Sequence, residues 1–118
     1  MAAGSTYTPI ATTTLGSNAS DVTFSSISGS YTDLVCVVFG ASTTAGSSTN
    51  GLRWQLNGDT GSNYSETQVY GDGSTATSTR GTNATDIGAG LLMQTSAGYF
   101  ATNIIHFMNY SNTTTYKT

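Results

Sequence analysis

The segment NGDTGSN, residues 57–63, holds the side chains that are best suited to bind a metal ion. Asn57, Asp59 and Asn63 offer oxygen atoms at alternate positions, as the ligands of a calcium loop do. The pattern departs from the EF-hand loop because Ser62 stands where that loop needs glycine, and Gln68 stands where it needs glutamate. The Asn-Gly pair is typical of a sharp reversal. We therefore predict a structured turn, with these three residues as a weak calcium candidate and with no cofactor.

Nucleophilic or zinc chemistry would have to use His106 or Cys36, the single residues of their types. His106 lies between Ile104 and Met108 in an apolar segment, which favours a histidine in the core or at an interface. Cys36 lies in the run LVCVVF with no cation nearby, so we interpret it as a small buried hydrophobe. One cysteine allows no disulfide within the chain. The sequence has no HExxH motif, no CxxC motif and no second histidine, so a zinc site is not expected.

Carboxylates offer a second route to catalysis, because a glycosidase needs two of them about 5–9 Å apart. Asp59 and Asp72 are the pair that the sequence leaves open for a glycan hydrolase. Aspartate in turns usually hydrogen-bonds its own backbone, however. We therefore predict that the protein is not an enzyme.

Aromatic side chains near polar loops suggest a glycan-binding site as an alternative. Tyr64, Tyr70 and Asp72 are the candidate contacts, since aromatic faces beside Asn and Asp suit sugars. Trp54 alternates with Leu52, as on a half-buried strand, so we place it in the core.

Composition limits the partners of this 118-residue chain. Charged residues make up 8% of it and the net charge is -3, whereas about a quarter of an ordinary domain is charged. Three basic residues cannot form a phosphate-binding patch, so nucleic acid is not an expected partner. No apolar run reaches the roughly 18 residues of a membrane span, and the start of the chain lacks the features of a signal peptide.

Short strand-like segments separated by Gly, Ser, Asn and Asp predict an all-β protein with no helix. We expect a single domain over residues 1–118, an antiparallel β-sandwich of jelly-roll type with long Gly/Ser/Thr loops. The run at 34–39 is apolar on both faces, which predicts a central strand covered from two sides. The expected strands are 7–15, 22–27, 34–39, 52–56, 66–70 and 99–110, with loops at 41–51 and 71–84 and an ambiguous segment at 87–94.

The last residues predict an incomplete sheet. Residues 113–118 are typical of the start of a strand, so either the polypeptide continues past Thr118 or another chain completes the sheet. With few lysines and one proline, the chain has little protection for open edges. We expect a homo-oligomer, with a trimer as the first expectation. His106, Met108 and Tyr110 are the expected contact residues.

Four stretches carry a resemblance to a known family. They are the opening MAAGSTYTPIATTTLGSNASDVTFSSISGSYTDLV, the segment LRWQLNGDTGSNYSET, the YGDG at 70–73 and the ending IIHFMNYSNTTTYKT. Together they resemble small virion proteins of tailed phages that infect marine bacteria, including cyanophages, which are described as tail-associated or fibre-like. The resemblance covers nearly the whole chain, and similar proteins continue beyond the point where this one stops. It carries over no functional residue.

The resemblance implies a non-enzymatic virion protein, assembled in the host cytoplasm, that forms a fibre, spike or decoration. Its expected partners are further copies of itself and other virion proteins. The alternative is a receptor-binding module that recognises cell-surface glycan.

Overall fold

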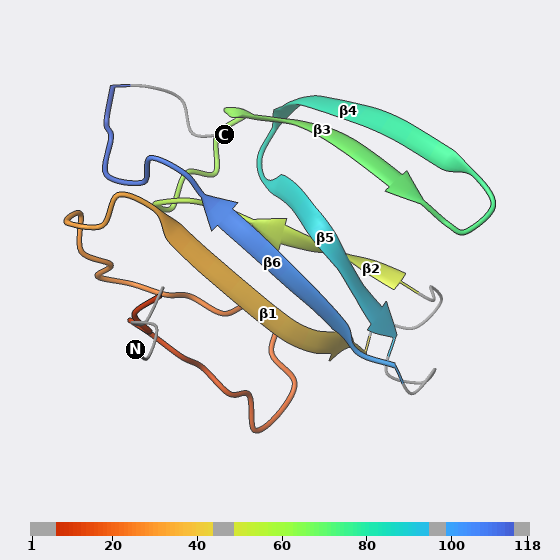
Figure 1. The fold of residues 1–118 in the computed structure, drawn as a ribbon, viewed down its shortest axis with the longest axis horizontal. Coiled ribbons are helices and arrows are strands. Elements are labelled where there is room, and N and C mark those ends of the chain that lie inside the picture. Colours follow the sequence, from red (N-terminus) through yellow and green to blue (C-terminus); the bar gives the residue numbers. More distant parts are fainter. Residues whose placement is uncertain (1–6, 44–48, 95–98, 115–118) are drawn as a thin grey trace, which may run out of the picture. The chain divides into compact units, whose positions relative to one another are not determined.

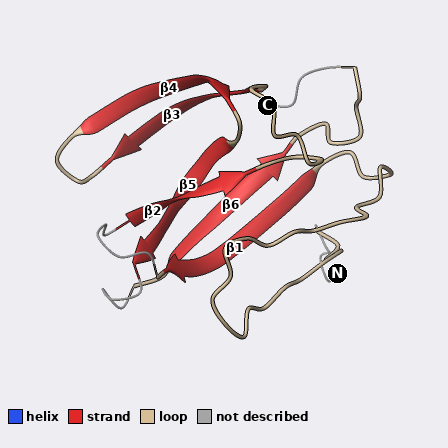
Figure 2. Ribbon diagram, turned by 180° about the vertical axis from the view of Figure 1, so that it is seen from behind, coloured by secondary structure: helices blue, strands red, loops and turns tan. Residues whose placement is uncertain are grey.

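The computed structural model describes residues 7–43, 49–94 and 99–114, and all the regular structure in these ranges is β-strand. The prediction of an all-β protein is therefore confirmed (Figures 1 and 2). Chain contacts divide the protein into two compact units, one of Met1–Val35 with His106–Thr118 and one of Cys36–Ile105. The strands are β1 (Leu34–Ser42), β2 (Thr49–Trp54), β3 (Tyr64–Gly71), β4 (Ala76–Ala84), β5 (Ile87–Gln94) and β6 (Ala101–Phe107).

Four of the strands form an open sheet in the order β2-β5-β1-β6. β2 pairs with β5 in the expected antiparallel sense, with a register shift between Gly51 and Arg53. β5 pairs with β1 in parallel, with Ala41 opposite Met93, which the sequence reading did not anticipate. A parallel pair needs a long crossover, and the chain between β1 and β5 provides one. The 87–94 segment, ambiguous in sequence, is thus a strand with a partner on each side.

β3 and β4 form a separate antiparallel ribbon, in which Tyr70 lies opposite Thr77 and Gly71 opposite Ala76. The prediction of a long loop over 71–84 is wrong, because β4 occupies residues 76–84 and the connection is a short turn. β4 is rich in threonine, which favours extended backbone, and it pairs with β3 from Ala76 to Ala84. The strand needs no apolar face to form. The 41–51 loop is shorter than predicted at both ends, and its residues 44–48 lie outside the described ranges.

The first unit contains long segments without regular structure. The predicted strands at 7–15 and 22–27 are wrong, because the described chain is irregular there and mostly exposed. The backbone of Tyr110 donates to the Thr32 carbonyl at 2.6 Å, and the Tyr110 hydroxyl donates to the Ile27 carbonyl at 3.3 Å. These bonds fix single points of the segment and make no ladder. Of the predicted last strand, Thr113 and Thr114 lie in a bend, and 115–118 fall outside the described residues.

Burial is shallow throughout the described residues. No side chain that the structure describes is fully buried, although β1, β3 and β6 alternate between half-buried and exposed positions. The prediction that 34–39 is covered from two sides is wrong, since one side of β1 is open to solvent. The strand order does not confirm a jelly-roll sandwich. No helix in the described part of the chain is long and apolar enough to cross a membrane.

Candidate functional site: an exposed apolar sheet face

The side of β1 that is open to solvent carries large apolar side chains. Val37 is 62% exposed and Phe39 is 71% exposed, whereas Cys36 and Val38 on the opposite side are half-buried. Successive residues of a strand point to opposite faces of the sheet. The apolar run at 34–39 therefore divides into one half that packs and one half that meets water.

β6 repeats this pattern on the neighbouring strand. Ile104 is 72% exposed, and Phe100, just before the strand, is 60% exposed. The rings of Phe39 and Phe100 stack, with centroids 5.4 Å apart and planes inclined by 21°. This contact places the exposed positions of β1 and β6 on the same side of the sheet.

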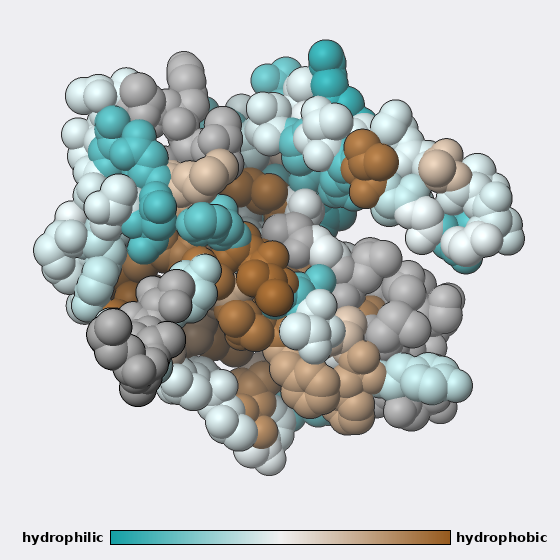
Figure 3. Space-filling view, in the orientation of Figure 1, coloured by the Kyte–Doolittle hydropathy of each residue, from teal (hydrophilic) through white to brown (hydrophobic). Residues whose placement is uncertain are grey.

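We define the β1–β6 face as the side chains of Val37, Phe39, Phe100 and Ile104. Figure 3 shows hydrophobic residues, in brown, gathered over the part of the view where Figure 1 draws β1 and β6. The sequences of both strands contain no Asp, Glu, Lys or Arg. An apolar face of this kind can bind another apolar surface. His106 lies two residues beyond Ile104 on the same side of β6.

Cys36 lies on the side of β1 away from this face. Its burial raises the pKa of the thiol above the usual value, so the reactive thiolate is disfavoured at neutral pH. The interpretation of Cys36 as a small hydrophobe agrees with this environment.

A polar cluster joins the β3–β4 ribbon to β5. The Glu66 carboxylate accepts hydrogen bonds from the Gly88 backbone N–H and, at 2.9 Å, from the Gln68 amide. Arg53 on β2 forms an ion pair with Asp86 at 3.3 Å beside this cluster. The sequence reading missed the cluster, although the Glu-x-Gln spacing on a strand already places both side chains on one side.

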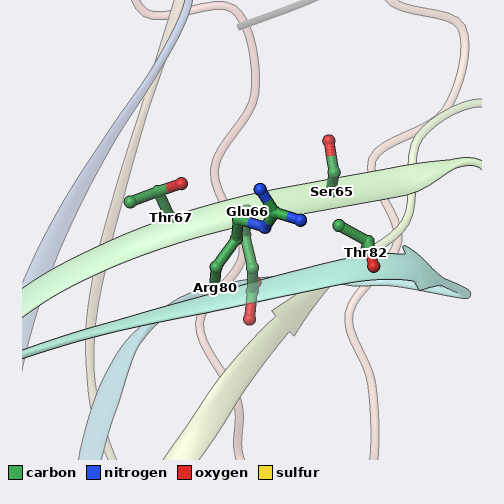
Figure 4. Close-up of a pocket in the computed structure, with 5 residues that line it drawn as sticks. All are labelled: Ser65, Glu66, Thr67, Arg80 and Thr82. Atoms are coloured by element: carbon green, nitrogen blue, oxygen red, sulfur yellow. The ribbon is translucent and has the colours of Figure 1, made fainter.

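The opposite side of the ribbon carries a shallow hollow of about 290 Å³ (Figure 4). Its hydroxyl groups come from Ser65 and Thr67 on β3 and Thr82 on β4, and Arg80 lies among them. Figure 4 shows the Glu66 side chain pointing away from the hydroxyls of Ser65 and Thr67. The hollow is open and polar, and Glu66 completes its lining beside the one cation and three hydroxyls.

The calcium candidates form a turn that satisfies its own polar groups. Asn57 and Gly58 have φ values of 55° and 69°, as a tight reversal requires. The Asp59 carboxylate accepts from the Gly61 N–H at 2.9 Å and from the Asn63 amide at 3.0 Å. The Tyr64 hydroxyl donates to the Asp59 carbonyl at 2.9 Å. Within the described residues, no three His, Cys, Asp or Glu side chains group closely enough to hold a metal ion.

The glycan candidates are spread along β3. The Tyr64 hydroxyl is occupied by the turn before the strand, where it also accepts from the Leu56 N–H at 3.1 Å. Tyr70 lies near the other end of the strand, roughly 20 Å away at the usual rise per residue, and is half exposed. Asp72 accepts from the N–H groups of Ser74 and Thr75 at 2.8 and 2.7 Å. The structure therefore does not bring Tyr64 and Tyr70 into one site.

The same strand separates the carboxylates considered for glycan hydrolysis. Asp59 precedes β3 and Asp72 follows it, so about 20 Å of extended chain lies between their positions. This separation is about two to four times the spacing that glycosidases use.

The predicted contact residues follow one another at the end of β6. His106 is half exposed, and its Nε2 lies 3.9 Å from an Asp33 carboxylate oxygen. Met108 is 48% exposed. Tyr110 is half-buried and bound through its hydroxyl to Ile27, so its role in the described structure is to hold the N-terminal segment. His106 falls on the same side of the β6 alternation as Ile104.

Comparisons of the chain with protein-family models, with curated proteins and with solved structures found no match.

Proposed function

We propose that this chain is a non-enzymatic structural protein of a phage virion, which forms a fibre, spike or decoration from several copies. The observation that carries the proposal is the β1–β6 face, together with the shallow burial of every described side chain. The largest contiguous apolar patch on a soluble protein is often an interaction site. In an assembly, neighbouring subunits can bury the apolar side chains that a single chain leaves exposed.

Two further features support the same proposal. Four stretches spread along the chain, two of them at its ends, resemble small virion proteins of marine tailed phages. The described sheets also have open edges on β2 and β6 and on the β3–β4 ribbon, which neighbouring chains can cover. Within the assembled particle, a jelly-roll-like β-sandwich is the arrangement of sheets that we propose.

Labelling of intact particles tests the proposal directly. An antibody raised against the purified chain should decorate particles of the encoding phage in electron micrographs. Quantitative mass spectrometry of purified particles should find several copies per particle. A chain present only in the soluble lysate would contradict the virion assignment. Specific binding of the isolated monomer to host-surface glycans would favour the receptor-binding alternative.

A further inference from the structure

The β1–β6 face is large enough to form an interface. Its four side chains are between 60% and 72% exposed, which corresponds to roughly 500 Å² of apolar surface. That area is at the upper end of the largest patch on an ordinary monomer, about 300–600 Å². Two such faces in contact would remove about 1,000 Å² from water, which is the lower limit for a specific protein interface.

The chemistry of the face suits a second copy of the same chain. Neither β1 nor β6 carries a charged residue of the Asp, Glu, Lys or Arg type, so two copies can meet without like-charge repulsion. The stacked rings of Phe39 and Phe100 present a flat aromatic surface beside the branched side chains of Val37 and Ile104. Aromatic and branched side chains of this kind interdigitate when two sheets pack face to face.

We propose that the β1–β6 face binds the same face of a second copy, so that two chains together supply the two layers of a β-sandwich. The two sheets would lie about 10 Å apart, as in other sandwiches. In this arrangement Val37 and Phe39 are covered by the partner, which explains why the 34–39 run is apolar on both sides. The intramolecular sandwich expected from the sequence becomes an intermolecular one.

The proposal sets the symmetry of the assembly. When the same surface patch is used on both copies, the contact is isologous and closes with two members. We therefore infer an even number of copies at this contact, in place of the trimer first expected from the sequence. The inference rests on the proposed structural role only for its biological setting. Self-association of the purified chain can be measured without the virion.

Sedimentation equilibrium over a concentration series tests the inference on the full chain. The wild-type protein should behave as a dimer, or as a multiple of a dimer. Ile104→Glu and Val37→Glu should each raise the dissociation constant by about a hundredfold or more, because each dimer would then bury two uncompensated carboxylates. Val69→Glu is the matched control, since Val69 is 80% exposed on β3 and lies outside the face. Far-ultraviolet circular dichroism should show the same β spectrum for all four proteins.

The outcomes separate this inference from the proposed function. A wild-type chain that stays monomeric at high micromolar concentration overturns the inference, whereas the labelling of particles decides the virion role independently. A dimer that survives both Ile104→Glu and Val37→Glu also overturns it, because another surface must then hold the copies together. Phe24→Glu places a charge in the exposed N-terminal segment. Loss of the dimer in this variant alone would assign the contact to that segment and refute the face-to-face arrangement.

Discussion

Replacing Gly88 by alanine should show how strongly the polar cluster of Glu66 and Gln68 attaches the β3–β4 ribbon to β5. A Cβ atom at Gly88 would lie 2.7 Å from the Gln68 amide nitrogen, 2.8 Å from a Glu66 carboxylate oxygen and 3.1 Å from Arg53 Nη1. The first two distances are shorter than a Cβ atom tolerates, so the Glu66 and Gln68 side chains must move. Both already bind the backbone of Gly88, so moving them breaks the link from the ribbon to β5.

The expected magnitude follows from the bonds that are lost. A hydrogen bond from a backbone N–H to a carboxylate stabilises a protein by about 1.5–3 kcal/mol. Replacing glycine by alanine at a conformation that alanine can adopt recovers about 0.4–1 kcal/mol through the unfolded chain. We therefore expect Gly88→Ala to lower the free energy of unfolding by about 1–2 kcal/mol. Gly40→Ala in β1 is the matched control, because a Cβ there meets nothing within 4 Å, and it should be neutral or slightly stabilising.

Urea unfolding followed by the fluorescence of Trp54, the single tryptophan, provides the assay at a fixed protein concentration. A double-mutant cycle with Glu66→Ala isolates the contact, since Gly88→Ala should cost much less once the carboxylate is absent. If Gly88→Ala proved as stable as Gly40→Ala, the ribbon would not be held by this cluster. A full penalty in the Glu66→Ala background would mean that the cost arises elsewhere.

Three other predictions concern single groups. The N–H groups of Thr75 and Ser74 hold the pKa of Asp72 below its ordinary 3.8, so ionised Asp72 stabilises the turn at higher pH and this contribution disappears as the pH falls through the lowered pKa. Asp72→Asn should therefore flatten the acid dependence of thermal unfolding below about pH 4, and an unchanged profile would contradict this. Because burial raises the pKa of Cys36, iodoacetamide at pH 8 should alkylate the folded chain more slowly than the urea-unfolded chain; equal rates would refute the assignment. Calcium and chelator should leave the melting temperature unchanged, because the Asp59 carboxylate is already satisfied by Gly61 and Asn63; a rise of several degrees with calcium would restore the metal site.

The wrong predictions of a strand at 7–15 and of a loop at 71–84 share a physical cause. Residues 7–15 are rich in threonine, yet a strand forms only where a second strand supplies its hydrogen bonds, and the described chain offers none there. Residues 76–84 lack an apolar face, yet they form β4 because β3 lies beside them in register. In both cases the secondary structure depends on pairing with a second strand, which lies outside the segment itself.

The candidate face was visible in sequence only in part. The apolar character of 34–39 is plain from the residues, but it predicts burial on both sides, which is wrong. Apolar side chains show that a surface favours removal from water; they do not show whether the cover comes from the same chain. Of the predicted sites, the 57–63 segment was correctly read as a turn because Asn-Gly at a reversal is a local preference.

The sequence by itself determined the all-β class, strand character within 34–39, 52–54, 66–70 and 101–107, and the sharp turn after β2; residues 55–56, 99–100 and 108–110 of the predicted strands lie outside β2 and β6. These properties depend on backbone preferences and on the alternation of side chains over a few residues. Only the tertiary structure decided that β1 pairs in parallel with β5, that Glu66 reaches Gly88, and that the Phe39 and Phe100 rings stack on an open face. Each of these contacts joins residues that are far apart in the chain, so its energy depends on the position of a partner that no local pattern specifies.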